Sequence, residues 1–338
     1  MSIHLAIIAF GISTIIIAIA GTQLSRAADQ LADLTKLGEA LAGAVLLGFT
    51  TSLPGIITSV TAAYNNHPEL AISNAIGGIA AQTVFLSIAD ITYPKTNLEH
   101  AAASFSNLMQ GVILMGLLSV VLIGISGPEI TLFNVHPFSV LIIILYLAGT
   151  RLISKAEENP MWRPHVTRET IEDVPDDDNM KTLNLKKVSI KFLLLAICVA
   201  AAGYMVAQSG ITIAQETGLS ESFVGTLFTA VATSLPELIV SIAAVRQGAL
   251  TLAVANIIGG NTFDVLFVAF SDIAYRDGSI LHAITNSQIF IIALTLFMTS
   301  VLILGLLHRQ KKGIGKIGWE SFLIIILYLA GNVFLFWH

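Results

Sequence analysis

Long apolar runs alternate with short polar breaks along almost the whole chain. Each run holds about 20 residues, the length that an α-helix needs to cross the hydrocarbon core of a bilayer. Ten runs are predicted as transmembrane helices, at 3–25, 38–64, 69–92, 104–126, 133–154, 189–210, 219–246, 250–274, 284–307 and 317–337. The pattern predicts an all-α integral membrane protein.

One long polar stretch, 155–188, interrupts this alternation and divides the runs into two sets of five. We therefore expect a first five-helix half at 1–154, a linker at 155–188 and a second five-helix half at 189–338. The linker contains the acidic sequence EDVPDDDN, and basic residues gather near its end.

The composition agrees with burial in lipid. Hydrophobic residues make up 55% of the chain and charged residues only 12%, against about 25% charged residues in a soluble domain. Basic residues predict the orientation, because cytoplasmic loops are rich in Lys and Arg. With the N-terminus outside, 16 of the 17 Lys and Arg residues fall on the inner side and only Arg276 falls outside. We expect a bacterial inner membrane protein with a cytoplasmic linker.

A shift of 182 residues aligns the chain with itself. Thr51 to Tyr93 then matches Thr233 to Tyr275 without a gap, with 17 identities among 43 pairs. Five predicted helices separate the two copies, so the second copy enters the membrane from the opposite side. Inverted repeats are a common plan of secondary transporters. The fold prediction is therefore ten transmembrane helices arranged as two inverted five-helix repeats.

Each copy carries the sequence TSLP, in which proline removes a backbone donor and clashes with the preceding helical turn. Pro54 and Pro236 are expected to break their helices within the membrane and to loosen nearby carbonyl groups. Unpaired carbonyl groups are costly in lipid, and a bound cation can satisfy them. Glu237 and Asp264 lie at membrane depth, where charged side chains are expensive and usually functional. The pattern predicts a cation site that is reached from both sides of the membrane.

The two copies resemble the alpha-repeats of the cation/calcium exchanger superfamily, which includes the sodium/calcium exchangers. The family pattern GTSLPE, followed by GNxxGSNxFN or GSNxFD, is matched by ATSLPELIVS and ANIIGGNTFD in the second copy. The first copy reads TTSLPGIITS and SNAIGGIAAQ, which fits in frame. The resemblance implies cation ligands at Glu237, Asp264, Thr51, Ser52, Gln82, Thr233, Ser234 and Asn261. We expect no cofactor; the expected partners are the lipid bilayer and the transported inorganic cations, which are calcium or another divalent cation, sodium and protons.

The first copy departs from the family pattern at Gly55, which stands in place of a glutamate. Gly78 and Gly260 replace serines that help to form two outer monovalent sites in the family. Two carboxylates remain at the recognised positions, and one divalent ion, two monovalent ions or two protons neutralise them. We therefore expect electroneutral exchange. On the same reasoning, Gly55→Glu would return the third acid.

The expected function is secondary active cation antiport of the sodium/calcium exchanger type, by alternating access. Calcium or another divalent cation would move against protons or sodium, and monovalent cation/proton antiport is one alternative. A second alternative is a transport-inactive membrane sensor or scaffold of the same fold. The chain contains neither H-E-x-x-H nor G-x-S-x-G. We expect no enzyme activity and no nucleic-acid partner.

Overall fold

The computed structural model describes residues 1–35, 48–93, 95–102, 104–158, 160–167, 170, 184–311, 313 and 317–337. Within these residues the regular structure is helical, apart from one isolated bridge between Leu132 and Val135. The predicted all-α class is confirmed for this part of the chain. Much of the predicted linker, including 171–183, lies outside the described residues, and so do 36–47 at the start of the second predicted span.

The helices before the linker are α1 (Ile3–Ile16), the π-helix η1 (Ile17–Gly21), α2 (Thr22–Thr35), α4 (Leu53–Tyr64), α5 (Pro68–Ile91), α6 (Leu98–Ala101), α7 (Phe105–Ser126) and α8 (Pro137–Glu158). After the linker come α9 (Leu185–Thr217), α10 (Glu221–Phe223), the π-helix η3 (Val224–Thr229), α11 (Ala230–Thr233), α12 (Leu235–Gln247), α13 (Leu250–Asp264), α14 (Leu266–Ala274), the 3₁₀-helix η4 (Ile280–His282), α15 (Asn286–His308) and α16 (Trp319–Trp337).

Among the described residues, eight helical segments are long and apolar enough to cross a membrane. The bent pair Glu221–Thr233 and Leu235–Gln247 makes a ninth if it is counted as one span. These nine segments overlap nine of the ten predicted spans. Of the remaining one, predicted at 38–64, the structure describes only 48–64, which contains the short apolar helix α4.

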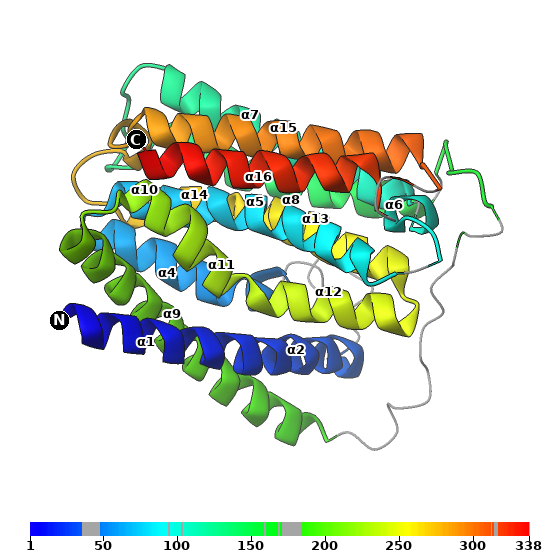
Figure 1. Cartoon of the computed structure of the whole chain (residues 1–338), viewed down its shortest axis with the longest axis horizontal. Coiled ribbons are helices and arrows are strands. Elements are labelled where there is room, and N and C mark those ends of the chain that lie inside the picture. Colours follow the sequence, from blue (N-terminus) through cyan, green and yellow to red (C-terminus); the bar gives the residue numbers. More distant parts are fainter. Residues whose placement is uncertain are drawn as a thin grey trace.

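Helix α5 runs through the centre of the bundle, with α15 and α16 on one side and α12 and α1 on the other (Figure 1). Nearly all of its residues are buried. Gly77 allows part of this packing, because a Cβ atom there would lie 2.6 Å from Thr226 Cα of η3. Only glycine permits two backbones to approach so closely. The central position of α5 brings its polar side chains against both halves of the chain.

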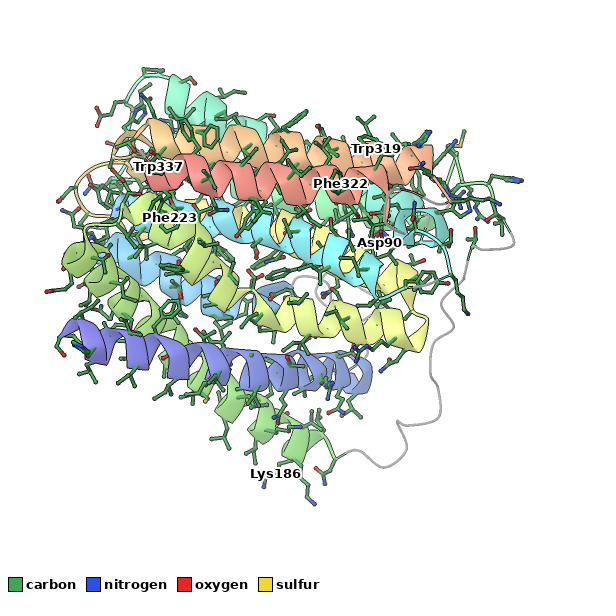
Figure 2. All side chains as sticks on the ribbon, in the orientation of Figure 1. Asp90, Lys186, Phe223, Trp319, Phe322 and Trp337 are labelled. Atoms are coloured by element: carbon green, nitrogen blue, oxygen red, sulfur yellow. The ribbon has the colours of Figure 1, made fainter. Side chains whose placement is uncertain are left out.

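Helices on the outside of the bundle expose apolar side chains, as a lipid-facing surface requires. Leu193 and Leu194 of α9 are both more than half exposed. Figure 2 shows Trp319 and Trp337 at opposite ends of α16, near opposite ends of the bundle. Tryptophan is enriched at both membrane–water interfaces, so these positions agree with α16 crossing a bilayer.

Helix α9 begins earlier and ends later than the span predicted at 189–210. Asn184 caps its start by accepting hydrogen bonds from the N–H groups of Lys186 and Lys187, at 3.0 and 3.4 Å. Gly218 ends the helix in the left-handed conformation, with φ 74°. Hydropathy locates the part of a helix that lies in lipid, whereas capping groups decide where the helix begins and ends.

Candidate functional site

Both TSLP sequences interrupt a helix at their serine. Ser234 lies where α11 meets α12 at a bend of 48°, and Pro236 occupies the first turn of α12. Pro54 likewise occupies the first turn of α4, which begins directly after Ser52. Proline is tolerated there because the first N–H groups of a helix have no intrahelical acceptor. The two serine hydroxyl groups therefore lie at helix breaks inside the bundle, where both residues are buried.

Gln82 of α5 and Asp264 of α13 meet between these breaks. Gln82 Nε2 donates to Asp264 Oδ2 at 2.6 Å and to Ser234 Oγ at 3.3 Å. Ser52 Oγ donates to the other carboxylate oxygen, Asp264 Oδ1. Positions 82 and 264 are 182 residues apart, and so are 52 and 234. The network thus joins equivalent positions of the two halves of the chain.

A small cavity of about 10 Å³, the central cavity, adjoins this network. One water molecule needs about this volume. The lining residues are Ser52, Gly55, Asn74, Gly78, Gln82, Thr233, Ser234, Glu237, Asp264 and Phe267. Glu237 Oε2 and Gln82 Oε1 are buried and have no hydrogen-bond partner. Buried acceptors without a donor cost free energy, and a cation in the central cavity would satisfy both.

Six of the eight predicted ligands line the central cavity: Ser52, Gln82, Thr233, Ser234, Glu237 and Asp264. Thr51 lines a larger cavity instead. Asn261 Nδ2 donates to Thr83 Oγ1 at 3.1 Å, and Asn261 Oδ1 has no hydrogen-bond partner. Within the described part of the chain, no group of three or more His, Cys, Asp and Glu side chains could hold a metal ion. A cation here would therefore meet two carboxylates and several neutral oxygen atoms.

Asn74, Gly55, Gly78 and Phe267 also line the central cavity, although the sequence does not mark them as ligands. The repeat contains a signal for Asn74, since it aligns with Asn256. Asn74 Nδ2 donates to Ser59 Oγ at 2.8 Å, and Asn256 Nδ2 donates to Ser241 Oγ at 3.1 Å. Asn74 Oδ1 is buried without a hydrogen-bond partner and is a further candidate oxygen ligand. Phe267 also aligns with an identical residue, Phe85, but an apolar residue in an apolar run gives no indication that it lines a cavity.

A larger cavity of about 670 Å³, the access cavity, is lined by residues of α2, α7, α8, α12 and α13 and by residues 48 and 51. It includes Arg26 of α2 and Gln247, the last residue of α12. It also includes Gly260, where a Cβ atom would lie 3.3 Å from Gln82 Oε1. The access cavity therefore extends from one end of α12 to the edge of the central cavity.

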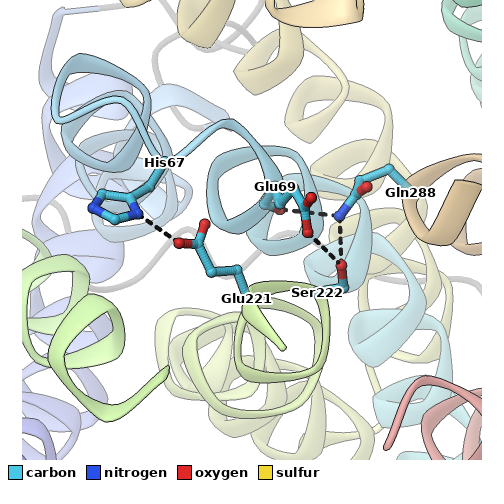
Figure 3. A network of polar contacts seen from close by, with 5 residues as sticks. All are labelled: His67, Glu69, Glu221, Ser222 and Gln288. Carbon is cyan, nitrogen blue, oxygen red and sulfur yellow. Dashed lines mark hydrogen bonds and ion pairs between the residues drawn. The ribbon is translucent and has the colours of Figure 1, made fainter. Parts of the chain in front are cut away.

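A polar network joins α5, α10 and α15 close to their N-terminal ends (Figure 3). His67 Nδ1 lies 2.6 Å from Glu221 Oε1, and Gln288 Nε2 donates to Ser222 Oγ at 2.7 Å. Ser222 Oγ donates to Glu69 Oε2 at 3.2 Å. None of these five residues lines the central cavity or the access cavity. This network ties helices together at the start of α10, whereas the access cavity reaches the far end of α12.

The comparisons with known proteins agree with this arrangement. The family model described as sodium/calcium exchanger protein matches residues 5–154 and 188–337. The inner membrane protein YrbG of Escherichia coli is 29% identical over 230 residues, covering 67% of this chain and 66% of that protein. The sodium/calcium exchanger MaX1 of Methanosarcina acetivorans is 32% identical over 156 residues, covering 45% of this chain and 41% of that protein.

Solved structures of exchangers have the same fold. The sodium-calcium exchanger NCX_Mj aligns with a TM-score of 0.62 and 20% identity, covering 98% of this chain and 99% of that one. The H⁺/Ca²⁺ exchanger CAX aligns with a TM-score of 0.71 and 15% identity, covering 98% of this chain and 84% of that one. The resemblance seen in the repeated TSLP sequences is confirmed, and the chain belongs to the sodium/calcium exchanger protein family.

Proposed function

We propose that the protein is a secondary active cation antiporter that moves calcium or another divalent cation against protons or sodium by alternating access. The observation that carries this proposal is Glu237 Oε2, a buried carboxylate oxygen without a hydrogen-bond partner in a cavity that Asp264 also lines. Burial of such a group is expensive unless a cation or a proton binds it. The relatives named as exchangers support transport as the purpose of this site.

The proposed ligands are the six side chains that line the central cavity and were named from the sequence: Ser52, Gln82, Thr233, Ser234, Glu237 and Asp264. Calcium prefers six to eight oxygen ligands, and these residues with Asn74 Oδ1 can supply that number. Asn261 Oδ1 and Thr51 lie outside the central cavity and are proposed as ligands of a second ion position or of the entry path.

The proposed architecture is ten transmembrane helices in two inverted five-helix repeats. Equivalent hydrogen bonds in the two halves support it. Asp90 Oδ1 accepts from Leu98 N at 2.6 Å, and Asp272 Oδ1 accepts from Ile280 N at 2.8 Å. The other carboxylate oxygens accept from Gly318 N and His136 N, at 3.2 and 2.7 Å. Each pair of equivalent positions is again 182 residues apart.

In the proposed orientation the N-terminus lies outside and the linker lies in the cytoplasm. Arg26 and Gln247, which line the access cavity, are then on the cytoplasmic side. The network of Glu221 and Ser222 in Figure 3 is on the outer side. The arrangement corresponds to an inward-open state, in which a cation reaches the central cavity from the cytoplasm.

Flux measurements on the purified protein in proteoliposomes test this function. Vesicles are loaded and challenged with calcium, magnesium, manganese, sodium or potassium, with and without a pH gradient or a sodium gradient. We expect divalent uptake that requires an opposing proton or sodium gradient. Uptake of sodium or potassium against protons alone would favour the monovalent alternative, and no flux of any cation would favour the sensor or scaffold. Glu216→Gln, at an exposed position near the end of α9, is the control for loss of a carboxylate outside the site.

A further inference from the structure

Gly55 lies directly against the ring of Phe267, and both residues line the central cavity. A Cβ atom at position 55 would lie 2.6 Å from Phe267 Cε2 and 3.2 Å from Phe267 Cζ. Real Cβ atoms do not approach other heavy atoms as closely as the first distance. The Cβ atom of a glutamate at this position would therefore clash with the ring, so the side chain cannot enter the central cavity here unless the ring moves.

Other aromatic side chains hold this ring in place. Phe267 and Phe263 are in edge contact, with ring centroids 6.4 Å apart and an interplanar angle of 77°. Phe263 in turn contacts Tyr146 edge-on, at 5.6 Å and 85°. Phe267 is only 3% exposed. Because packed interiors leave few voids, a large shift of the ring would disturb its contact with Phe263.

The equivalent place in the second half is arranged differently. Glu237 occupies the position equivalent to Gly55, and Phe85 occupies the position equivalent to Phe267. Phe85 is buried, yet it does not line the central cavity, whereas Phe267 does. The phenylalanine of the half that has lost the acid thus packs away from the central cavity, whereas the phenylalanine of the half that keeps the acid lies against Gly55 and lines the central cavity.

We infer that Phe267 is a specificity-determining residue of the ion site, because its ring occupies the space that a side chain at position 55 would enter and forms that part of the central-cavity wall with hydrocarbon. The inference rests on the proposed function, since it concerns which cations the site accepts. With Phe267 in place, a cation in the central cavity meets the carboxylates of Glu237 and Asp264 and neutral oxygen atoms, with no third carboxylate from position 55. Gly55→Glu alone does not restore a third ligand, contrary to the expectation from the sequence.

Calcium binding to the purified protein tests the inference with four forms: wild type, Gly55→Glu, Phe267→Ala and the double variant. Binding is measured with radioactive calcium at neutral pH, with manganese and sodium as competitors. We expect Gly55→Glu alone to bind no tighter than wild type. The double variant should bind at least about tenfold tighter, because calcium affinity rises with the number of ligand charges. The inference would be overturned if Gly55→Glu alone bound calcium as tightly as the double variant. It would also be overturned if a folded double variant bound calcium no more tightly than the wild type.

Thermal unfolding without added cations separates this inference from the proposed function. Gly55→Ala adds only the Cβ atom that meets the ring, and should lower the melting midpoint by at least about 2 °C. Adding Phe267→Leu to the Gly55→Ala variant should recover part of the lost melting midpoint. Phe85→Leu is the matched control, and should recover none of it. If the melting midpoint of Gly55→Ala equals that of the wild type, the inference is overturned, whatever the result of the cation-binding measurements. Absence of cation binding in every form, with the melting pattern as expected, would instead count against the proposed function.

Discussion

Gln82→Glu would exchange an amide for a carboxylate of nearly the same shape in the proposed ion site. It would remove the donor that lies 2.6 Å from Asp264 Oδ2. Loss of a hydrogen bond to a charged group costs about 1.5–3 kcal/mol. Two unit charges separated by 2.6 Å repel by about 6 kcal/mol at an effective dielectric constant of about 20. The site without a cation is therefore strongly destabilised, and a divalent cation relieves the repulsion.

The change contains no steric obstacle of the kind found at position 55, so it alters the charge and the hydrogen-bond donor of the side chain without adding bulk. We expect tighter calcium binding by Gln82→Glu than by wild type, and a larger stabilisation when calcium is added. A tenfold gain in affinity is about 1.4 kcal/mol, which corresponds to about 2 °C in the melting midpoint of a chain of this size. The assay compares melting with and without calcium at about pH 8.5, well above the usual carboxylate range.

Gln110→Glu supplies the matched control for this experiment. Gln110 lines the access cavity and not the central cavity, so the same change in charge is made away from Asp264. We expect a smaller effect of calcium there than in Gln82→Glu. A calcium-induced shift in Gln82→Glu that is no larger than in wild type would refute the reasoning, because the number of carboxylates would then not set divalent affinity.

Three further predictions concern the site, a buried acid outside the spans, and the coupling. Glu237→Gln and Asp264→Asn should each lower cation exchange in proteoliposomes at least about tenfold, because each removes one of two ligand charges. The melting midpoint of each variant should stay at the wild-type value. Near-normal flux in both variants would count against the proposed site. Burial, followed by the negative charges of Asp90 and Glu320, raises the pKa of Glu99 from 4.5 to about 8. Above the ordinary pKa of a glutamate, the unfolded chain releases this proton while the folded chain keeps it, so the free energy of unfolding should fall from about pH 5 to about pH 8. Glu99→Gln should remove this pH dependence and raise the free energy of unfolding by on the order of 3–5 kcal/mol at about pH 8. Thermal melting of both forms at the two pH values measures this. Exchange should be electroneutral, so an imposed membrane potential of about 100 mV should leave the transport rate nearly unchanged. Such a potential would otherwise change the free energy by about 2.3 kcal/mol for each elementary charge moved. A membrane potential generated by transport itself would contradict the count of two carboxylates.

The sequence by itself determined the features that depend on one segment at a time. The length of an apolar run decides whether a helix can cross a bilayer, and the nine described segments follow the predicted runs. Proline lacks a backbone donor wherever it stands, so the break before Pro236 is observed at Ser234, as a bend of 48°. The acids Glu237 and Asp264 were visible because charged residues are rare in such runs.

The tertiary structure alone decided which side chains meet. Helix α5 is buried on nearly every side, so hydrophobic periodicity does not indicate which way Gln82 and Asn74 point. Asn261 matches the family pattern, yet its side-chain N–H group donates to Thr83 Oγ1 of the other half, and Asn261 does not line the central cavity. Phe267 of the second half lies against Gly55 of the first half, a contact that the sequence of neither half reveals. A repeat in the sequence sets equivalent positions, but the contacts made between the halves decide what each position does.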